Sequence, residues 1–308
     1  MYNFTHNNHL SYSIGGRPFG FREQGFEKYE VKLGRIDKDH YRKNNYQSEL
    51  LRVTDLVYKD LGKDLVLFLS GGTDSEIVLR NFLEYGVKPR CAIIKFKDEY
   101  NAPDVQEAIE RCREVDVDLE ILDFDVKNFF YSGEAEDFAK KIQCTQVTYL
   151  MVYYHIYKLG MPAVMGGELL LTRQITKDSN FWYYTFRENE DASAMRFSNV
   201  FNIPLVNEWF SYTPEIMLYF LEAQGIGVEQ LFADPYKLTS VSSKNAILKQ
   251  LYPNIRDKKK THGFEKLLAF NYEAYKSILA DSYKRLEPAI DGIPLSKAIM
   301  DLRGEDDY

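Results

Sequence analysis

The sequence predicts an α/β fold with a doubly wound, mainly parallel sheet. From Asp64 onward, short apolar runs alternate with amphipathic stretches of helical length, which is the pattern of repeated strand and helix units. Of the 308 residues, 45% are hydrophobic and 28% are charged, a balance that is typical of a packed globular protein and excludes a disordered or fibrous chain. An N-terminal arm and a helical C-terminal region are expected to flank this core.

Four apolar runs are expected to form strands, and the stretches between them are expected to form helices. The strands are predicted at residues 65–69, 91–96, 119–124 and 163–165. The helices are predicted at residues 75–85, 103–114, 126–141 and 145–159. Pro103 fits the first turn of its helix, where a missing N–H group breaks no hydrogen bond.

Three regions are predicted along the chain. They are an irregular or β-rich arm at 1–60 that ends in a helix-like segment at 49–61, an α/β domain at 61–235, and a helical region packed on that domain at 236–308. The last region contains helical patterns at 242–251, 263–280 and 295–302. Residues 169–202 lack clean periodicity and are interpreted as an excursion over the carboxyl edge of the sheet, where open α/β sheets bind ligands.

Charge and cysteine content restrict the class of protein. The formal net charge of -7 provides no general positive field for a phosphate backbone, which argues against nucleic acid as a partner. The three cysteines have no CxxC spacing, so neither a disulfide framework nor a cysteine zinc site is expected. The first ten residues do not resemble a secretory leader, and no apolar run is long enough to span a membrane. A cytoplasmic protein without a membrane segment is therefore expected.

The most informative stretch is residues 70–75, which follow an apolar strand and open an amphipathic helix. Paired glycines let successive N–H groups turn toward one point, and the helix adds its positive N-terminal partial charge, so the stretch is suited to bind an anion. An acid inside an anion site makes sense if Mg²⁺ lies between it and bound phosphates. No lysine closes the loop, which excludes the GxxxxGK[ST] type. The predicted ligand-binding residues are Ser70, Gly71, Gly72, Thr73, Asp74 and Ser75, with Asp74 as the metal ligand.

This Ser-Gly-Gly-Thr-Asp-Ser stretch resembles the SGGxDS pyrophosphate loop of the N-type ATP pyrophosphatase (PP-loop) superfamily. The resemblance implies an adenine nucleotide α-hydrolase-like fold, ATP and Mg²⁺ as cofactors, attack at the α-phosphorus, and release of pyrophosphate and AMP. The competing interpretation is a glycine turn capped by an acid and a hydroxyl. It is disfavoured because the stretch joins an apolar strand to a helix.

Two further stretches resemble the synthetase domain of asparagine synthetase and its β-lactam-forming relatives. Residues 165–168 end a strand as that family's GEGxDE segment does, and residues 251–255 with 262–264 resemble its LPxxI and GF stretch. The resemblance implies a ligase that adenylates a small carboxylate for capture by ammonia or an amine.

The sequence also departs from that family. It begins with Met1 and Tyr2 in place of a cysteine nucleophile, and only about sixty residues precede the loop, so glutamine hydrolysis within this chain is not expected. Leu171 and Thr172 stand where the family has an Asp-Glu pair, so the acid that would help to hold the metal is missing. The family's lysine aligns on Thr261, one residue from Lys260.

Three charged side chains are predicted to be catalytic. Glu168 follows a strand end and two glycines, where a carboxylate reaches the crevice and orients an amine or acts as a base; the alternative is an acid of a first helical turn. Lys258 and Lys260 would stabilise negative charge on the phosphates, although a run of lysines is often a solvated face.

The second strand is expected to contribute to nucleotide binding. By resemblance, the backbone of Ile94 to Phe96 would meet the adenine, and Lys95 would approach the phosphates unless it is an exposed lysine at a strand end. Gly167 is added to the predicted ATP-binding residues because it belongs to the stretch at 165–168.

Three other polar residues are given structural interpretations. Asn101 and Asp104 are interpreted as helix caps before Val105, and His155 as a packed or capping residue.

Two other functions remain open from the sequence. One is an RNA-modifying enzyme of the same superfamily, of the kind that adenylates or thiolates tRNA; the acidic charge balance and the lack of paired cysteines count against it. The other is an ATP-binding protein whose catalysis is impaired. The missing second acid favours it, and the intact Asp74 counts against it.

Overall fold

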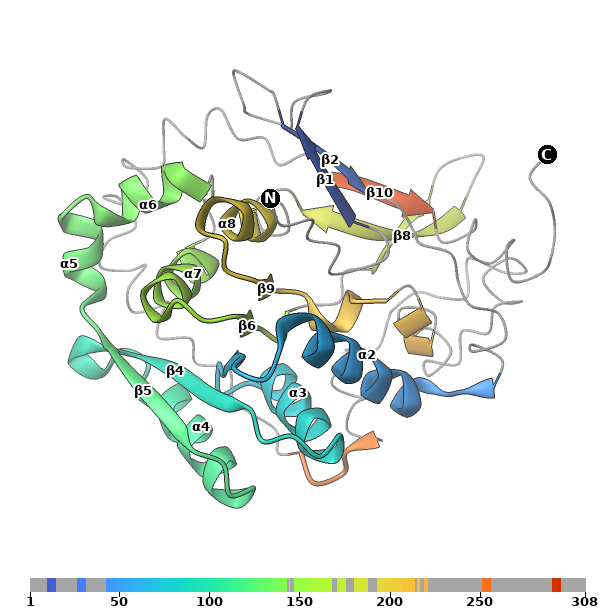
Figure 1. Cartoon of the computed structure of the whole chain (residues 1–308), viewed down its shortest axis with the longest axis horizontal. Helices are drawn as coiled ribbons and strands as arrows, with labels where there is room; N and C mark the ends of the chain where they lie inside the picture. The colour runs from blue at the N-terminus through green and yellow to red at the C-terminus, as the bar shows by residue number, and fades with distance from the viewer. Residues whose placement is uncertain are drawn as a thin grey trace.

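A five-stranded, all-parallel sheet lies at the centre of the computed structural model (Figure 1). Its strands are β3 (Val66–Phe68), β4 (Arg90–Phe96), β5 (Leu119–Phe124), β6 (Ala163–Val164) and β9 (Leu205–Val206), in the order β5-β4-β3-β6-β9. The structure describes residues 10–14, 27–31, 43–142, 144, 147–167, 171–175, 180–187, 193–213, 215–216, 219–220, 251–255 and 290–294.

The strand order confirms the predicted doubly wound α/β fold. From β3 the chain winds outward through β4 to β5, then returns to the other side of β3 and adds β6 and β9. The direction of winding therefore reverses between β3 and β6. In open α/β sheets, the crevice at the carboxyl ends of the two strands at such a switch point is where ligands bind.

Seven helices of the described residues accompany the central sheet. They are α2 (Tyr46–Leu61), α3 (Thr73–Glu84), α4 (Ala102–Glu114), α5 (Val126–Tyr131), α6 (Glu134–Ile142), α7 (Val147–Leu159) and α8 (Ser193–Phe201). Two short 3-10 turns, η1 (Lys97–Glu99) and η3 (Trp209–Ser211), follow β4 and β9.

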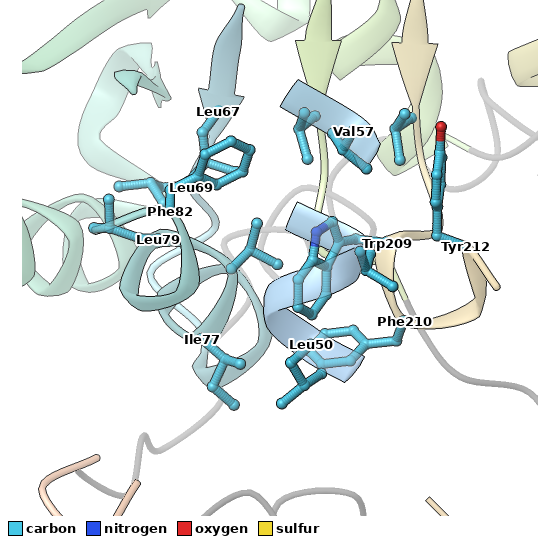
Figure 2. Packing of buried hydrophobic residues seen from close by; sticks show 14 of the residues in the cluster. Leu50, Val57, Leu67, Leu69, Ile77, Leu79, Phe82, Trp209, Phe210 and Tyr212 are labelled. Carbon is cyan, nitrogen blue, oxygen red and sulfur yellow. The ribbon is translucent and has the colours of Figure 1, made fainter. Parts of the chain in front are cut away.

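Alternate residues of β3 enter two separate cores, one on each face of the sheet. Leu67 packs with α2, α3 and α4, whereas Val66 and Phe68 pack with α5, α6, α7 and α8. Because both faces of the sheet are covered at β3, its residues Val66, Leu67 and Phe68 are all apolar and buried, which is why this strand could be recognised in the sequence. Figure 2 shows part of the first core, with Trp209 packed against α2 and Ile77 of α3 close to Leu50.

The second core is rich in aromatic rings and contains His155. The imidazole packs edge-on against Phe124, with 4.5 Å between ring centroids, and Nδ1 lies 2.8 Å from the carbonyl oxygen of Met151. Burial lowers the pKa of His155. The interpretation of this histidine as a packed residue is confirmed.

Most of the predicted elements are present, with two differences. The helix expected at 126–141 is divided into α5 and α6 at Gly133, whose φ of +85° is in the left-handed region that favours glycine. The helix-like segment expected at 49–61 begins earlier, at Tyr46, because the side chain of Asn45 accepts a hydrogen bond of 3.0 Å from the Ser48 N–H and caps it. Strand β9 was not predicted.

Two antiparallel sheets lie outside the central sheet. One pairs β1 (Leu10–Ile14) with β2 (Glu27–Val31), as expected for a β-rich arm. The other has the order β10-β8-β7 and contains β7 (Leu171–Ile175), β8 (Asn180–Arg187) and β10 (Ile290–Pro294). The excursion predicted at 169–202 thus contains a β-hairpin and α8.

The C-terminal prediction is tested at few positions. β10 adds a strand between the helical patterns predicted at 263–280 and 295–302. Of the helical pattern predicted at 242–251, Leu251 is described and is helical. The rest of that pattern and the patterns at 263–280 and 295–302 lie outside the described residues. The domain boundaries at 60 and 235 stay predictions. Within the part of the chain that the structure describes, no helix is long and apolar enough to cross a membrane.

Helices α3 and α4 are joined by a buried ion-pair network. The guanidinium Nε of Arg111 lies 3.1 Å from Oε2 of Glu76, and both side chains are about 5% exposed. Arg80 binds the other oxygen of Glu76 at 2.7 Å, and Glu107 lies 3.3 Å from Arg111. The network links the first turn of α3 to the last turn of α4 and so fixes the two helices relative to each other.

Replacing Arg111 with Met is expected to lower the free energy of unfolding by about 3 kcal/mol, because it leaves Glu76 buried with one cation fewer. Urea denaturation measures the loss. Arg113→Met, an exposed position on the same helix, is the control and should change stability by less than about 0.5 kcal/mol. Equal effects of the two substitutions would contradict a buried network that holds the helices.

Candidate active site

Residues 70–75 form the end of the turn after β3 and the first three residues of α3, at the switch point of the sheet. Gly72 is the N-cap residue of α3 and has no side chain with which to cap the first turn, and Gly71 has a φ of +65°. The first-turn N–H groups of a helix have no partner inside the helix and carry its positive partial charge. The loop therefore leaves the start of α3 without a side-chain cap, and anion binding there stays a prediction.

Two serine hydroxyls hold the loop in shape. Ser75 Oγ accepts from the Ser70 N–H at 3.2 Å and donates to the Gly72 carbonyl at 3.1 Å. The two hydroxyl oxygens lie 3.2 Å apart, and Ser70 Oγ also accepts from the Gly72 N–H at 3.3 Å. Ser75 is buried, Ser70 is exposed, and Thr73 and Asp74 are half-buried. Ser70 and Ser75 thus brace the loop, and their contact with phosphate stays a prediction.

The glycines of the loop region are required by close packing. A Cβ on Gly71 would lie 2.3 Å from the carbonyl oxygen of Asp104 in the first turn of α4. A Cβ on Gly166, which follows β6, would lie 3.1 Å from the Ser75 nitrogen and 3.4 Å from the Asp74 Cβ. Elements α3, α4 and β6 therefore meet at this loop, and no side chain intervenes between them.

Asn101 acts differently from the cap that the sequence suggested. It stands at the N-cap position of α4 but makes no capping hydrogen bond with its side chain. Its Oδ1 accepts from the Phe96 N–H at 2.8 Å, and its Nδ2 donates to the Ile94 carbonyl at 2.7 Å. The amide thus extends the ladder of β4 beyond the end of β3. An adenine that used the same two backbone groups would have to displace it. Asp104, interpreted as a second cap, lies inside the first turn of α4.

A cavity of about 410 Å³ opens at the carboxyl ends of β4 and β5. This volume is within the range of small-molecule sites. Lys95 lines the cavity and is half-buried, which places this predicted side chain on the strand next to the loop. Lys97 pairs with Asp125 at 2.9 Å at the same cavity. The lining residues are Lys95, Phe96, Lys97, Asp98, Glu99, Asp123, Phe124 and Asp125.

Glu208, which the sequence reasoning did not single out, lies against one of the predicted site residues. It follows β9, is 7% exposed, and accepts a hydrogen bond of 3.2 Å from the Tyr149 hydroxyl. A Cβ on Gly167 would lie 2.4 Å from Glu208 Oε2, so the carboxylate lies against a residue that was predicted to bind ATP. The sequence signal was an acid two residues after a very short apolar run, which is too weak to recognise.

Tyr46, in the first turn of α2, was also missed. Its ring packs edge-on against Phe220, and the residue is 5% exposed. Burial raises the pKa of Tyr46, and the nearby Tyr252 and Asp74 raise it further. Burial therefore keeps the phenol of Tyr46 in its neutral form.

The residues that the structure describes fit ATP and Mg²⁺. The start of α3 has no side-chain cap and offers N–H donors to phosphates, and Asp74 in its first turn offers a carboxylate to a cation. No group of three or more potential metal ligands occurs among the described residues. Mg²⁺ that is carried by nucleotide phosphates needs only one or two protein carboxylates, so a site for it does not require a group of three ligands. The predicted catalytic residues Glu168, Lys258 and Lys260 lie outside the described residues.

No protein-family model and no curated protein matches the chain. Many solved structures are similar to it, among them the following three. The predicted subunit of a tRNA methyltransferase from Methanocaldococcus jannaschii is 14% identical, with 72% of this chain and 88% of that chain covered and a TM-score of 0.34. NMN synthetase from Francisella tularensis is 11% identical, with 82% of this chain and 98% of that chain covered and a TM-score of 0.32. The NH3-dependent NAD synthetase from Campylobacter jejuni is 13% identical, with 87% of this chain and 98% of that chain covered and a TM-score of 0.29. A likeness of this degree assigns no function.

Proposed function

We propose that this chain is an ATP-dependent, AMP-forming ligase of the asparagine-synthetase type. It adenylates a small carboxylate, which is then captured by ammonia or an amine. The observation that carries the proposal is the loop at residues 70–75, which lies at the switch point of a doubly wound sheet and opens α3 with an uncapped glycine.

The reaction has two steps in this proposal. A carboxylate oxygen attacks the α-phosphorus of ATP, the bond to the β-phosphate oxygen breaks, and pyrophosphate leaves. The amine then attacks the acyl carbon, AMP leaves, and the proton of the amine is released. The N–H groups of the loop and the start of α3 hold the leaving pyrophosphate. Mg²⁺, when bound with ATP, neutralises charge that develops on the phosphates, and Asp74 holds it.

Residues outside the described part complete the proposal by resemblance. Glu168 orients the amine or takes its proton, and a lysine among residues 258–260 stabilises the α-phosphate. Lys95 is on the strand next to the loop, at a cavity of about 410 Å³ that is within the volume range of small-molecule sites.

Exchange of labelled pyrophosphate into ATP, measured with a panel of small carboxylates, tests the first step. We expect exchange that depends on Mg²⁺ and on one class of carboxylate, and net product only when ammonium or a primary amine is added. With glutamine in place of ammonium, we expect no net product. Efficient glutaminase activity would contradict this part of the proposal.

Lys260→Ala is expected to lower kcat about a hundredfold or more, because such a cation acts on charge that grows in the transition state. Binding of ATP should change much less. Lys258→Ala and Lys259→Ala should each change kcat by less than about tenfold. Steady-state kinetics of the three variants separate these roles. If all three variants turn over like the parent, the lysines at 258–260 form a solvated surface and have no catalytic role.

A further inference from the structure

The edge of β4 that faces β3 continues past the end of β3. The two strands pair as far as Ala92, and the Leu69 N–H adds one further bond of 2.8 Å to the Ala92 carbonyl. Groups that point to one edge of a strand recur at every second residue, a step of about 7 Å. The carbonyl of Ile94 and the N–H of Phe96 therefore continue this edge. Because Leu69 is followed directly by residues 70–75, this stretch of edge lies beside the loop.

The side chain of Asn101 covers these two backbone groups. Its Nδ2 donates to the Ile94 carbonyl at 2.7 Å, and its Oδ1 accepts from the Phe96 N–H at 2.8 Å. The residue is 7% exposed. Only one orientation of the amide satisfies both groups, because the strand fixes which of them is the donor. A single carboxamide thus occupies the whole of this stretch of edge.

An acceptor beside a donor on a strand selects partners that present a donor beside an acceptor. A carboxamide does so, and so does adenine, whose N6 amino group donates and whose neighbouring ring nitrogen accepts. Hypoxanthine has an acceptor oxygen in place of the amino group and a ring N–H in place of the acceptor. It therefore presents the two groups in the opposite order.

The first turn of α4 joins this edge to the loop. The Asn101 carbonyl accepts from the N–H groups of Asp104 at 3.0 Å and Val105 at 3.1 Å, so the backbone of residue 101 begins the helix without help from its side chain. A Cβ on Gly71 would lie 2.3 Å from the Asp104 carbonyl oxygen. The amide can therefore leave the edge while α4 and the loop keep their contact.

The segment that returns Asn101 to β4 has a strained backbone. Asp98 and Glu99 are consecutive residues other than glycine, and they have φ angles of +64° and +58°. This left-handed region is unfavourable for L-residues, and such strain is common at ligand sites. Phe96, whose N–H the amide covers, also lines the cavity at the ends of β4 and β5. The covered edge thus borders open space.

We propose that Asn101 determines nucleobase specificity by occupying the base-binding edge of β4 in the free protein. A base binds there only by displacing the amide from Ile94 and Phe96. Adenine does so because it offers the same donor and acceptor in the same order. This inference rests on the proposed function, because the base arrives as part of ATP.

Nuclear magnetic resonance of protein labelled with ¹⁵N-asparagine tests the displacement. The Asn101 side-chain peaks are identified by their contacts with the Phe96 N–H in the free protein. ATP in EDTA should shift these peaks and speed the exchange of their protons with solvent about tenfold or more, because they lose the bond to Ile94. Pyrophosphate, which has no base, should leave the peaks unchanged.

Calorimetry of the Asn101→Ala variant in EDTA tests the specificity. The variant should bind ATP about tenfold more tightly than the parent, because the base no longer competes with the amide. Its affinities for pyrophosphate and for inosine triphosphate should change by less than about twofold, since neither ligand presents the order of groups that the edge selects. Asn199→Ala is the matched control, because it removes an amide that bonds the Met195 carbonyl on α8 at 2.9 Å. It should bind all three ligands like the parent.

The outcomes separate this inference from the proposed function. Asn101 peaks that do not move in protein saturated with ATP, or weaker ATP binding by Asn101→Ala, overturn the role of Asn101 and leave the proposed function intact. An equal gain for ATP and inosine triphosphate overturns the selection of the base. A parent protein that binds neither ATP nor pyrophosphate overturns both proposals. If Asn101→Ala does not fold, the resonance experiment on the parent decides.

Discussion

Replacing Asp74 with Asn is expected to lower ATP turnover about a thousandfold or more, which corresponds to about 4 kcal/mol of transition-state stabilisation. Asp74 is half-buried in the first turn of α3, at the loop that is proposed to hold pyrophosphate. The substitution removes the charge that holds the cation and leaves the volume of the side chain nearly unchanged. The free energy of unfolding should therefore change by less than about 1 kcal/mol.

Steady-state turnover and urea denaturation of the same preparation measure both effects. Asp116→Asn is the control, because Asp116 is an acid that pairs with Lys88 on the surface. It should turn over like the parent. Parent-like turnover of Asp74→Asn would contradict the role of Asp74, and a loss of stability equal to the loss of activity would show that its role is structural.

Gly71→Ala is expected to raise the dissociation constant for pyrophosphate a hundredfold or more and to lower the free energy of unfolding by about 3 kcal/mol. The added methyl group would lie 2.3 Å from the Asp104 carbonyl oxygen, a backbone atom that moves only if α4 moves. The φ of +65° also places alanine in the left-handed region, at a cost of about 1 to 2 kcal/mol. The loop must therefore change its shape to accept the substitution.

Gly86→Ala separates the clash from the backbone strain. Gly86 has a φ of +90°, and nothing lies within 4 Å of a Cβ placed on it. We expect this variant to lose about 1 to 2 kcal/mol of stability and to bind pyrophosphate like the parent. Calorimetric titration with pyrophosphate compares the two variants. Equal affinities would show that the packing of Gly71 against α4 does not shape the site.

The loop was predictable from the sequence because its signals are local. Leu65 to Leu69 form an apolar run that is buried in the cores on both faces of the sheet. Two glycines follow this run, and an acid stands in the first turn of the helix after them. Each of these features depends on residues within a few positions of one another. The strand, the turn and the start of the helix can therefore be predicted without knowledge of the rest of the chain.

The other side of the site depends on contacts between distant segments, which the sequence does not reveal. Strand β9 has two residues, Leu205 and Val206, and its place beside β6 is set by the order of strands in the sheet. Glu208 consequently looked like an ordinary acid. Asn101 was interpreted as a helix cap because it precedes a helix, yet its amide pairs with the end of β4. Both errors concern residues whose partners are defined by the tertiary fold.

The products of ATP cleavage test the central claim most directly. Phosphorus-31 magnetic resonance distinguishes AMP and pyrophosphate from ADP and orthophosphate in a single reaction with Mg²⁺, ammonium and the carboxylate that supports exchange. The adenylation proposed at residues 70–75 predicts AMP and pyrophosphate in equal amounts. Formation of ADP and orthophosphate would contradict the claim, because the bond between the β and γ phosphates would then be the one that breaks.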